Sequence, residues 1–384
     1  MSATEYGTEP SASGSPGGVR ATAALLEEVG APLQLAEVDL GAPAEGEILV
    51  RMRGVGICHT DLSARDGIFP VPLPAVLGHE GSGVVEAVGA GVEKLRVGDH
   101  VALSFDHCGE CSQCSGGHPA YCDAFAPLNY FGTRLDGSVT MHRGEDEVYG
   151  NWFGQSSFAT HAIASVRNAV KVPNDLPLEL LGPLGCGFQT GAGSVLNVMR
   201  VDAGEGIIIF GLGAVGLGAL MAAKAVGCDP IIGVDLNPER LAIATELGAT
   251  HTIDPTETED FLWRVQELAA PGLHYSFDAV GAGPVIRQAL ESLRTAGHCV
   301  TVGFQGLEHE ITIDQGHLLL GRQLSGVIEG DAEPGEFIPR LIELHRAGKF
   351  PFDRLVKTFA FDQINEAMAA AESGEVVKPV LVFP

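Results

Sequence analysis

The stretch GIIIFGLGAVGLGALMAAKAVG, residues 206–227, predicts a strand, a tight turn and a helix in succession. GIIIF is a continuous apolar run, which is typical of a strand buried on both faces of a sheet. GLGAVG follows with glycines at Gly211, Gly213 and Gly216, and the rest has helical composition. A lone G-x-G-x-x-G pattern is weak evidence in a chain with 51 glycines, so the segments around it decide its interpretation.

Apolar strands and helices keep alternating after residue 227. PIIGVD is a second strand that ends at Asp235, and NPERLAIATELGA is a helix with Pro238 near its start and Gly248 near its end. ATHTID, HYSFDAVG and GHCVTVGF continue the pattern to about residue 327. The alternation predicts an α/β fold with a doubly wound parallel sheet, a Rossmann domain over residues 188–327.

The turn and the second strand together predict a dinucleotide site. Gly211 permits the tight turn, Gly213 lets the backbone approach the pyrophosphate, and Gly216 lets the helix pack close to the strand. The helix N-terminus offers unpaired N–H groups to the phosphates. Asp235 places a carboxylate where ribose hydroxyls bind, and it would repel the 2′-phosphate of NADP. We therefore expect NAD as cofactor, against the alternative that Asp235 is only a turn residue.

Residues 19–187 have a different sequence pattern, in which glycine and proline separate short segments that are predicted to be strands. EILVRMRGVG (47–56) alternates apolar and polar residues like a half-buried strand, and GSGVVEAVG and DHVALSF are similar. A helix and a final strand are expected in FIPRLIELHRAGKF and VKPVLVF, within residues 328–384. We expect a β-rich domain over 19–187 to which residues 328–384 return, and a flexible tail at residues 1–18.

Composition excludes several classes of protein. A length of 384 residues with 45% hydrophobic residues suits two or three domains. The formal charge of −26 argues against binding to nucleic acid or anionic membranes, and no apolar run is long enough to span a membrane. The N-terminus lacks the pattern of a secretory signal, so a cytoplasmic protein is expected. In a reducing compartment, the eight cysteines favour metal binding over disulfides.

Four of the cysteines form a C-x2-C-x2-C-x7-C pattern at Cys108, Cys111, Cys114 and Cys122. Four thiolates so close in sequence can surround one zinc ion tetrahedrally. Because no coordination position is left open, such a zinc would be structural and would hold together a glycine-rich lobe. An iron–sulfur cluster uses similar spacings, and four unrelated buried cysteines are the remaining alternative.

Other histidines and cysteines have simpler interpretations. His107 and His118 flank the cysteine pattern, but four thiolates make them superfluous as ligands, so we expect them at the surface. Cys228 and Cys299 lie beside a predicted helix and a predicted strand, and they are interpreted as buried small hydrophobic residues.

Three further stretches carry candidate metal ligands: GICHTD (56–61), GHEGSG (78–83) and LGPLGCGFQTG (181–191). Spacing alone does not join them, and a lone histidine or cysteine is commonly structural. GHEGSGVVEAVGAGV (78–92), however, resembles the zinc alcohol dehydrogenase signature G-H-E-x2-G-x5-G-x2-V.

With the four-cysteine lobe and GLGAVG following in order, the chain from about residue 20 to its end resembles the medium-chain dehydrogenase/reductase superfamily. The resemblance implies a GroES-like β-rich catalytic domain joined to the Rossmann domain. It also implies two zinc ions, and oxidation of a primary alcohol to its aldehyde with hydride transfer to NAD.

The resemblance assigns a second metal site. Cys58, His79 and Cys186 would bind a catalytic zinc and leave a fourth position for water or substrate. Glu80 matches the family glutamate that lies behind the metal. Asp61 matches the acid that orients the ligand histidine.

Further roles follow from the same resemblance. Thr60 matches the hydroxyl residue that hydrogen-bonds the alcohol and passes its proton towards the cofactor ribose. Well-known members carry a relay histidine three residues later, where this chain has Ser63, so the proton could leave through Ser63, water or His59. The implied cofactor contacts are Thr190 and Val215 beside the nicotinamide, His59 and Lys378 at the pyrophosphate, Arg240 near the adenosine ribose, and Leu212 in the turn.

A finer resemblance bears on the substrate. Residues 58–89, 126–138, 153–162 and 178–197 are similar to bacterial aryl-alcohol (benzyl alcohol) dehydrogenases, whose close relatives act on allylic terpenoid alcohols such as geraniol. Trp152 and Phe153 fall at pocket-lining positions in that comparison. Aromatic walls would suit a flat conjugated alcohol; the alternative is that both are core residues.

Two other functions stay open at this point. A thiol-adduct formaldehyde dehydrogenase shares both zinc sites, but it would need an open basic cleft, which the acidic chain disfavours. A non-catalytic nucleotide-binding member of the superfamily would usually lack zinc ligands, whereas all seven proposed ligands are present. The family implies a homodimer or homotetramer formed through the cofactor domain.

Overall fold

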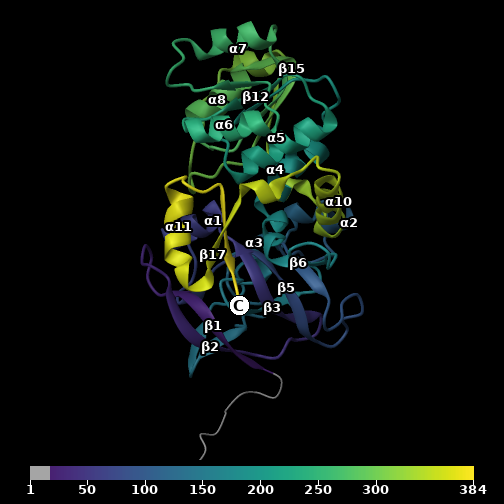
Figure 1. Cartoon of the computed structure of the whole chain (residues 1–384), viewed down its shortest axis with the longest axis vertical. Coiled ribbons are helices and arrows are strands. Elements are labelled where there is room, and N and C mark those ends of the chain that lie inside the picture. The colour runs from purple at the N-terminus through teal and green to yellow at the C-terminus, as the bar shows by residue number, and fades with distance from the viewer. Residues whose placement is uncertain (1–17) are drawn as a thin grey trace, which may run out of the picture.

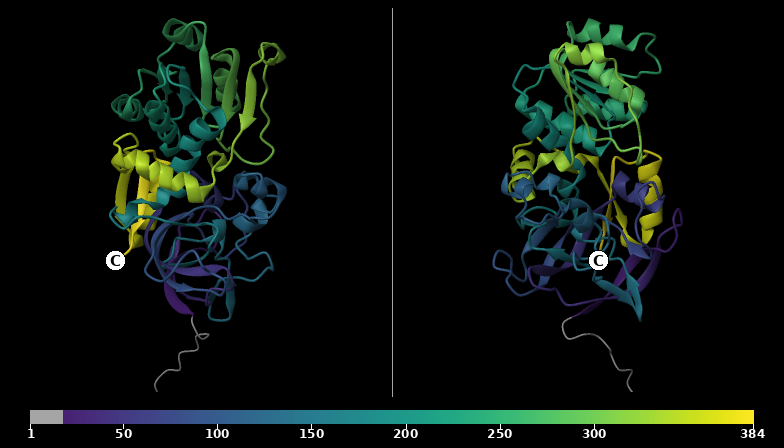
Figure 2. Two further views of the ribbon diagram at one scale, coloured as in Figure 1. Left: turned by 90° about the vertical axis from the view of Figure 1, so that its right-hand side faces the viewer. Right: turned by 180° about the vertical axis from the view of Figure 1, so that it is seen from behind.

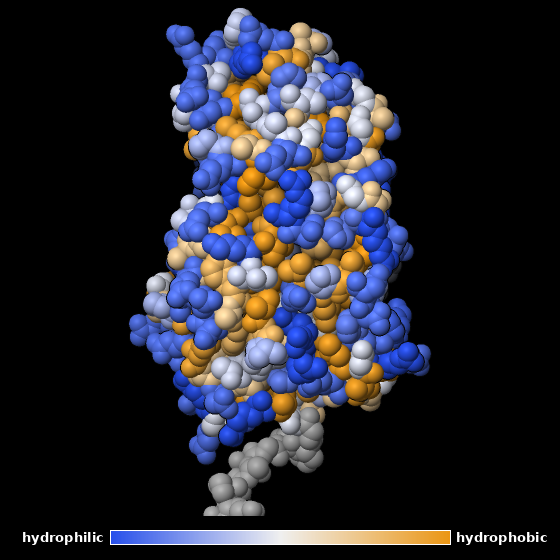
Figure 3. Space-filling view, in the orientation of Figure 1, coloured by the Kyte–Doolittle hydropathy of each residue, from blue (hydrophilic) through white to orange (hydrophobic). Residues whose placement is uncertain are grey.

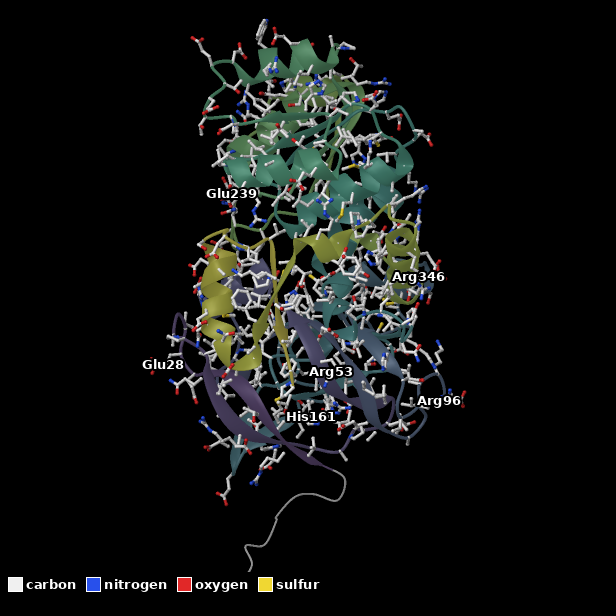
Figure 4. The ribbon with its side chains drawn as sticks, in the orientation of Figure 1. Glu28, Arg53, Arg96, His161, Glu239 and Arg346 are labelled. Carbon is white, nitrogen blue, oxygen red and sulfur yellow. The ribbon has the colours of Figure 1, made fainter. Side chains whose placement is uncertain are left out.

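The computed structural model describes residues 18–384, which form two halves stacked along the long axis of the molecule (Figure 1). The predicted tail at residues 1–18 lies outside the described residues except for Gly18. No helix within 18–384 combines the length and the apolar character needed to cross a membrane. Charged side chains such as Glu28, Arg96 and Arg346 project from the outer margin (Figure 4).

The lower half of Figure 1 contains two sheets made mostly of antiparallel pairs. The first has the strand order β4-β1-β2-β7-β8, and the second β10-β6-β5-β3-β18-β17 with β9 also paired to β3. Their bounds are β1 Val19–Leu26, β2 Gln34–Leu40, β3 Glu47–Gly56, β4 Ala75–Val76, β5 Glu80–Val88, β6 His100–Leu103, β7 Met141–Arg143, β8 Asp146–Val148, β9 His161–Ser165, β10 Ala169–Lys171, β17 Val356–Ala360 and β18 Lys378–Val382. β18 pairs antiparallel with β3, so the C-terminal segment completes a sheet that begins near the start of the chain.

Several helices accompany these strands, most of them short. They are α1 His59–Arg65, α2 Ser112–Ser115, α3 Phe125–Asn129, α10 Pro334–Arg346 and α11 Ile364–Glu372. The view from behind shows the yellow α11 lying next to α1, so the C-terminal segment covers the element that begins beside Cys58 (Figure 2).

The upper half is the predicted doubly wound parallel sheet, with the order β13-β12-β11-β14-β15-β16. All neighbouring strands in it are parallel. Its strands are β11 Ile207–Phe210, β12 Ile231–Val234, β13 His251–Ile253, β14 Leu273–Asp278, β15 Leu293–Thr301 and β16 Gln323–Gly326. The helices are α5 Ala214–Val226, α6 Pro238–Leu247, α7 Phe261–Ala269, α8 Gly283–Glu291 and α9 Gln315–Leu319.

Alternate residues of β11 explain why both faces of this sheet are covered. Ile207 and Ile209 pack into the apolar cluster that holds α5, whereas Ile208 and Phe210 pack into the opposite cluster with α7 and α8. A strand buried on both faces needs a continuous apolar run, which is what the sequence contains. The predicted fold class, a GroES-like half and a Rossmann half, is confirmed.

The two halves share one core where they meet. α4 (Gly187–Gly193) continues into a π-helical segment, Ser194–Met199, and packs tightly on α5. A Cβ at Gly191 would lie 2.0 Å from the carbonyl oxygen of Val215, so only glycine allows this approach. On the face shown in Figure 3, apolar residues gather along the middle of the molecule between more hydrophilic margins. The metal-ligand candidates lie close to this junction.

Candidate active site

Three segments far apart in sequence bring the candidate catalytic ligands together. Cys58 precedes α1, His79 precedes β5, and Cys186 precedes α4. The ligand atoms of these three residues and of Glu80 all lie within 4.8 Å of one another. Spacing along the chain could not join these residues, and the fold does.

His79 is oriented as a metal ligand should be. Its Nδ1 lies 2.9 Å from Oδ1 of Asp61, and both side chains are fully buried. Asp61 also accepts hydrogen bonds from the backbone N–H of Gly78 and the indole N–H of Trp152, each at 3.1 Å. The buried Nε2 of His79 has no hydrogen-bond partner in residues 18–384, which fits a nitrogen reserved for a metal ion.

The two sulfurs complete a donor set that suits zinc. A hydrogen bond with the Cys186 thiol lowers the pKa of Cys58 well below that of an ordinary thiol, even though burial opposes this. The thiolate is the form of cysteine that binds metals. Two thiols and one imidazole at this separation match the ligands of a catalytic zinc, which keeps a fourth position open. Thr60 Oγ1 lies 3.7 Å from Cys58 Sγ, beside this set.

Glu80 lies behind the ligands and is held by a buried ion pair. Lys378 Nζ donates to both carboxylate oxygens of Glu80 at 2.8 Å and to the carbonyl oxygen of Ile57 at 3.0 Å. Burial raises the pKa of Glu80, and the charge of Lys378 opposes this rise. Burial alone would lower the pKa of Lys378, but Glu80 raises it. The two side chains form a buried ion pair behind the ligands.

This contact bears on the role predicted for Lys378 at the cofactor pyrophosphate. All three ammonium protons already have protein acceptors. Gly187 lies between Lys378 and the start of α5. A Cβ added to Gly187 would be 3.5 Å from Lys378 Nζ and 3.8 Å from Ala214 Cβ, so the Lys378 ammonium lies near the first residue of α5. Contact with a phosphate stays a prediction.

The four-cysteine lobe forms a second, separate metal site. The sulfurs of Cys108, Cys111, Cys114 and Cys122 lie within 4.8 Å of one another. Backbone N–H groups donate to three of these sulfurs at 3.3–3.5 Å. Backbone donors at Cys114 and Asp123 lower the pKa of Cys111 to about 6. A closed set of four cysteine sulfurs fits a structural zinc.

One prediction for the flanking histidines is wrong. His107 is buried, because its ring packs against Phe105 with 6.1 Å between centroids. His118 is exposed, as predicted, and its Nδ1 lies 2.9 Å from the Asp331 carboxylate. Cys228 and Cys299 are both buried, as expected of small hydrophobic residues.

The glycine-rich turn has the geometry that a bound phosphate requires. Gly211 has a φ of +83°, a conformation that other residues rarely adopt. A Cβ at Gly216 would lie 1.8 Å from the carbonyl oxygen of Gly211, whereas a Cβ at Gly213 would meet no atom within 4 Å. Gly216 is therefore packed against the rest of the turn, whereas the space around Gly213, at the N-terminus of α5, is free for a ligand. The Asp235 carboxylate accepts from Leu212 N at 2.6 Å and from Asn237 N at 2.9 Å.

The other residues predicted to bind the cofactor differ in their burial and in their hydrogen-bond partners. Arg240 is buried, and its Nη2 donates to the carbonyl oxygens of Gly374 and Val376, while Nη1 has no partner in the described part of the chain. Thr190 and Val215 are half-buried on α4 and α5, and His59 is exposed at the start of α1.

Both halves match known families. Residues 44–174 match the family described as alcohol dehydrogenase GroES-like domain, and residues 214–345 match the zinc-binding dehydrogenases. The chain is 50% identical over 370 residues to a geraniol dehydrogenase of Castellaniella defragrans, covering 95% of this chain and 98% of that protein. This chain belongs to the zinc-binding medium-chain alcohol dehydrogenases.

Two more relatives of this alcohol dehydrogenase are informative. The crystal structure of benzyl alcohol dehydrogenase from Acinetobacter calcoaceticus superposes with a TM-score of 0.92 at 42% identity, covering 95% of this chain and 100% of that one. An S-(hydroxymethyl)glutathione dehydrogenase of Paracoccus denitrificans is 33% identical, with 95% and 100% coverage. The predicted family resemblance is confirmed.

The two predicted pocket residues of this alcohol dehydrogenase pack against the metal ligands. Phe153 stacks on the imidazole of His79, with 4.4 Å between centroids, and Trp152 donates to Asp61. Both are almost fully buried. These contacts let them hold His79 and Asp61 in place; a role as pocket walls stays a prediction.

Sequence reasoning missed three other aromatic residues at this junction. Phe69 packs on Tyr130 at 4.4 Å and on Phe304 at 5.8 Å, and Tyr130 lies 5.9 Å from Trp152. Phe304 follows β15 and is 39% exposed, so rings from both halves of the alcohol dehydrogenase meet here. Burial and the charge of Glu329 raise the pKa of Tyr130. No motif marks these residues, although Phe69 and Tyr130 lie in stretches similar to aryl-alcohol dehydrogenases.

Glu329 is the other residue that the sequence analysis missed. Its side chain is buried, with Oε2 lying 3.4 Å from Gln189 Nε2 and 3.5 Å from Thr190 Oγ1. Burial raises the pKa of Glu329 to about 7. It also contacts the Cys186 thiol, so a second carboxylate borders the ligand set of this alcohol dehydrogenase.

Proposed function

We propose that this alcohol dehydrogenase oxidises a primary aryl or allylic alcohol to its aldehyde and transfers the hydride to NAD. Residues 19–187 and 328–384 form its catalytic domain, and residues 188–327 its cofactor domain. The observation that carries the proposal is the convergence of Cys58, His79 and Cys186 at the junction of the two halves. An alcohol held there can approach a cofactor bound at the carboxyl ends of the parallel strands.

The residues around the first metal site have separable tasks. Zinc bound there supplies Lewis acidity, which lowers the pKa of an alcohol hydroxyl. Asp61 holds the tautomer and orientation of His79. Thr60 accepts a hydrogen bond from the substrate hydroxyl and passes its own hydroxyl proton on towards the cofactor ribose, so that it stays neutral as the alcohol loses its proton. Of the predicted proton exits on α1, His59 is exposed and reaches solvent, whereas Ser63 is buried, which favours His59.

Asp235 supports NAD over NADP. Its carboxylate is tied to the turn by the backbone of Leu212, and it stands at the end of the second strand of the sheet. A fixed negative charge at this position accepts hydrogen bonds from ribose hydroxyls and repels a 2′-phosphate.

A conjugated substrate is supported by two observations. Phe69 packs on Tyr130, Phe304 and Trp152, and these rings offer flat apolar surfaces one layer of side chains from His79. Stacking on such rings adds about 0.5–1.5 kcal/mol beyond burial. The relatives named for geraniol and benzyl alcohol are also more similar to this chain than the glutathione-adduct dehydrogenase is.

The rival functions find less support. A bulky anionic thiol adduct would bind poorly to a chain with a net charge of −26. A non-catalytic role does not account for seven ligands gathered into two complete sets.

A homodimer or homotetramer formed through the cofactor domain is supported by the exposed edge of the parallel sheet. β16 is the last strand, and its outer backbone groups are unpaired within the described residues. Large apolar side chains are exposed at Leu318, Leu319 and Leu320, which lie at the end of α9, just before β16 in the chain. A second copy pairing edge to edge would cover both features.

A substrate and cofactor panel tests the proposal. Benzylic, allylic, aliphatic and thiol-adduct substrates are each assayed with NAD and with NADP. We expect the highest kcat/KM for benzylic or allylic alcohols with NAD, and two zinc ions per chain. A preference for NADP, for the thiol adduct or for short aliphatic alcohols would contradict the corresponding part of the proposal.

Thr60→Ala tests the proton step. Loss of one well-placed catalytic group costs about 2–4 kcal/mol of barrier, so we expect kcat/KM to fall by about 30- to 1,000-fold. Thr60→Ser keeps a hydroxyl and should retain most of the activity. Zinc content, measured by mass spectrometry, should be unchanged in both variants. Full activity of Thr60→Ala would remove Thr60 from the scheme.

A further inference from the structure

Glu329 follows β16 closely, at the carboxyl edge of the parallel sheet. Its backbone is left-handed, with a φ of +50°, and Gly330 and Asp331 are left-handed as well. This turn packs against α4, where a Cβ at Gly193 would lie 2.4 Å from the carbonyl oxygen of Gly330. This left-handed turn brings the Glu329 side chain to the ligand set at the point where the chain leaves the parallel sheet.

The Glu329 carboxylate has no positively charged side chain paired with it among residues 18–384. Glu80 is balanced by Lys378, and two thiolates would balance a zinc ion. Asp61 accepts from four N–H groups. Glu329 contacts the Cys186 thiol and two neutral donors, Gln189 and Thr190, at 3.4 and 3.5 Å, and it forms no ion pair within residues 18–384. A buried carboxylate without a cation is costly, so a positive charge supplied by a ligand would be stabilised here.

The proposed cofactor carries such a charge in only one of its redox states. The nicotinamide ring is cationic in NAD⁺ and neutral in NADH. For hydride transfer, the ring must contact an alcohol held at the ligand set, which Glu329 borders. We infer, on the basis of the proposed function, that Glu329 is a cofactor-binding residue that favours NAD⁺ over NADH by placing its carboxylate against the oxidised nicotinamide ring. Tighter binding of NAD⁺ than of NADH favours loading of the enzyme with the oxidised cofactor and leaves the overall equilibrium of the reaction unchanged.

Binding measurements without substrate test this inference. NADH affinity is measured by fluorescence titration, and NAD⁺ affinity by displacement of NADH. In Glu329→Gln we expect the Kd for NAD⁺ to rise about tenfold and the Kd for NADH to change less than about twofold, as expected when one nearby charge is removed. Glu329→Asn should show the same shift, and it suits the left-handed backbone if the glutamine variant fails to fold.

Two control variants are used. One keeps a carboxylate at position 329, and the other removes one carboxylate at a position outside the site. Glu329→Asp retains a carboxylate and should keep the wild-type ratio of the two affinities within about threefold. Glu336→Gln removes an exposed carboxylate from the first turn of α10 and should leave the ratio unchanged.

The remaining outcomes separate the two proposals. An unchanged ratio in both neutral variants, or equal weakening of NAD⁺ and NADH, would overturn the inference about Glu329. Loss of zinc from Glu329→Gln would assign the carboxylate to the metal and would also overturn it. A wild-type chain that binds neither NAD⁺ nor NADH would contradict the proposed function itself.

Discussion

Cys58→Ala is expected to lower kcat/KM for benzyl alcohol by about 10⁴-fold or more. The change removes one of three ligands and leaves His79 Nε2 and Cys186 to hold the ion alone. Lewis-acid activation of the hydroxyl contributes several kcal/mol, and each 1.36 kcal/mol corresponds to about tenfold in rate. Mass spectrometry should find one zinc ion per chain in place of two.

The same variant should keep its cofactor affinity. The turn at Gly211–Gly216 does not depend on Cys58, so the Kd for NADH should change less than about twofold. Cys299→Ala is the matched control, because it also removes a buried thiol but lies within β15, away from the ligand set. Retention of both zinc ions and of activity in Cys58→Ala would show that another residue binds the metal.

Cys111→Ala is expected to have the largest effect on stability. It opens the closed set of four sulfurs in a lobe whose helices are very short. Structural zinc binds with an apparent free energy of about 10–16 kcal/mol in small domains, so losing it should lower the apparent Tm by about 10 °C or more. Thermal unfolding followed by circular dichroism, together with zinc analysis, measures both changes.

Activity distinguishes this site from the first one. At about 15 °C, the folded Cys111→Ala enzyme should keep kcat within about threefold of wild type, because the lobe holds no reacting group. Cys228→Ala, at a buried thiol outside both sites, should lower the Tm by only a few degrees. A cluster of iron and sulfur in place of zinc would appear as visible absorbance and bound iron, which would correct the assignment of the metal.

Local patterns predicted most of the elements that carry the cofactor site. EILVRMRGVG became β3 with the expected bounds, and the strand, turn and helix at 206–227 became β11 and α5. The alternation implied helices between the later strands, but no bounds were predicted for α7 and α8, although Asp260 caps α7 and a proline stands in the first turn of α8. The burial of His107 was missed for a related reason: a residue beside an exposed cysteine lobe can still point into the core.

Some residues of the two sites could be predicted from local sequence, and others could not. The four cysteines lie close in sequence, so their shared metal site follows from local spacing alone. Glu329 has no such signal, since its turn is defined by packing against α4 and by contact with Gln189 and Thr190. Lys378, expected at a phosphate, pairs with Glu80 because β18 returns beside β3.

The sequence by itself determined the class of fold, the closed cysteine site and the glycine-rich turn, because each rests on periodicity or on ligands within a few residues. Only the tertiary structure decided which distant side chains meet: Cys58, His79 and Cys186 at one point, Phe69 with Phe304, and Glu329 beside the ligand set. Contacts between distant segments depend on how the two halves and the returning C-terminal strand pack. Local propensity carries no information about that packing.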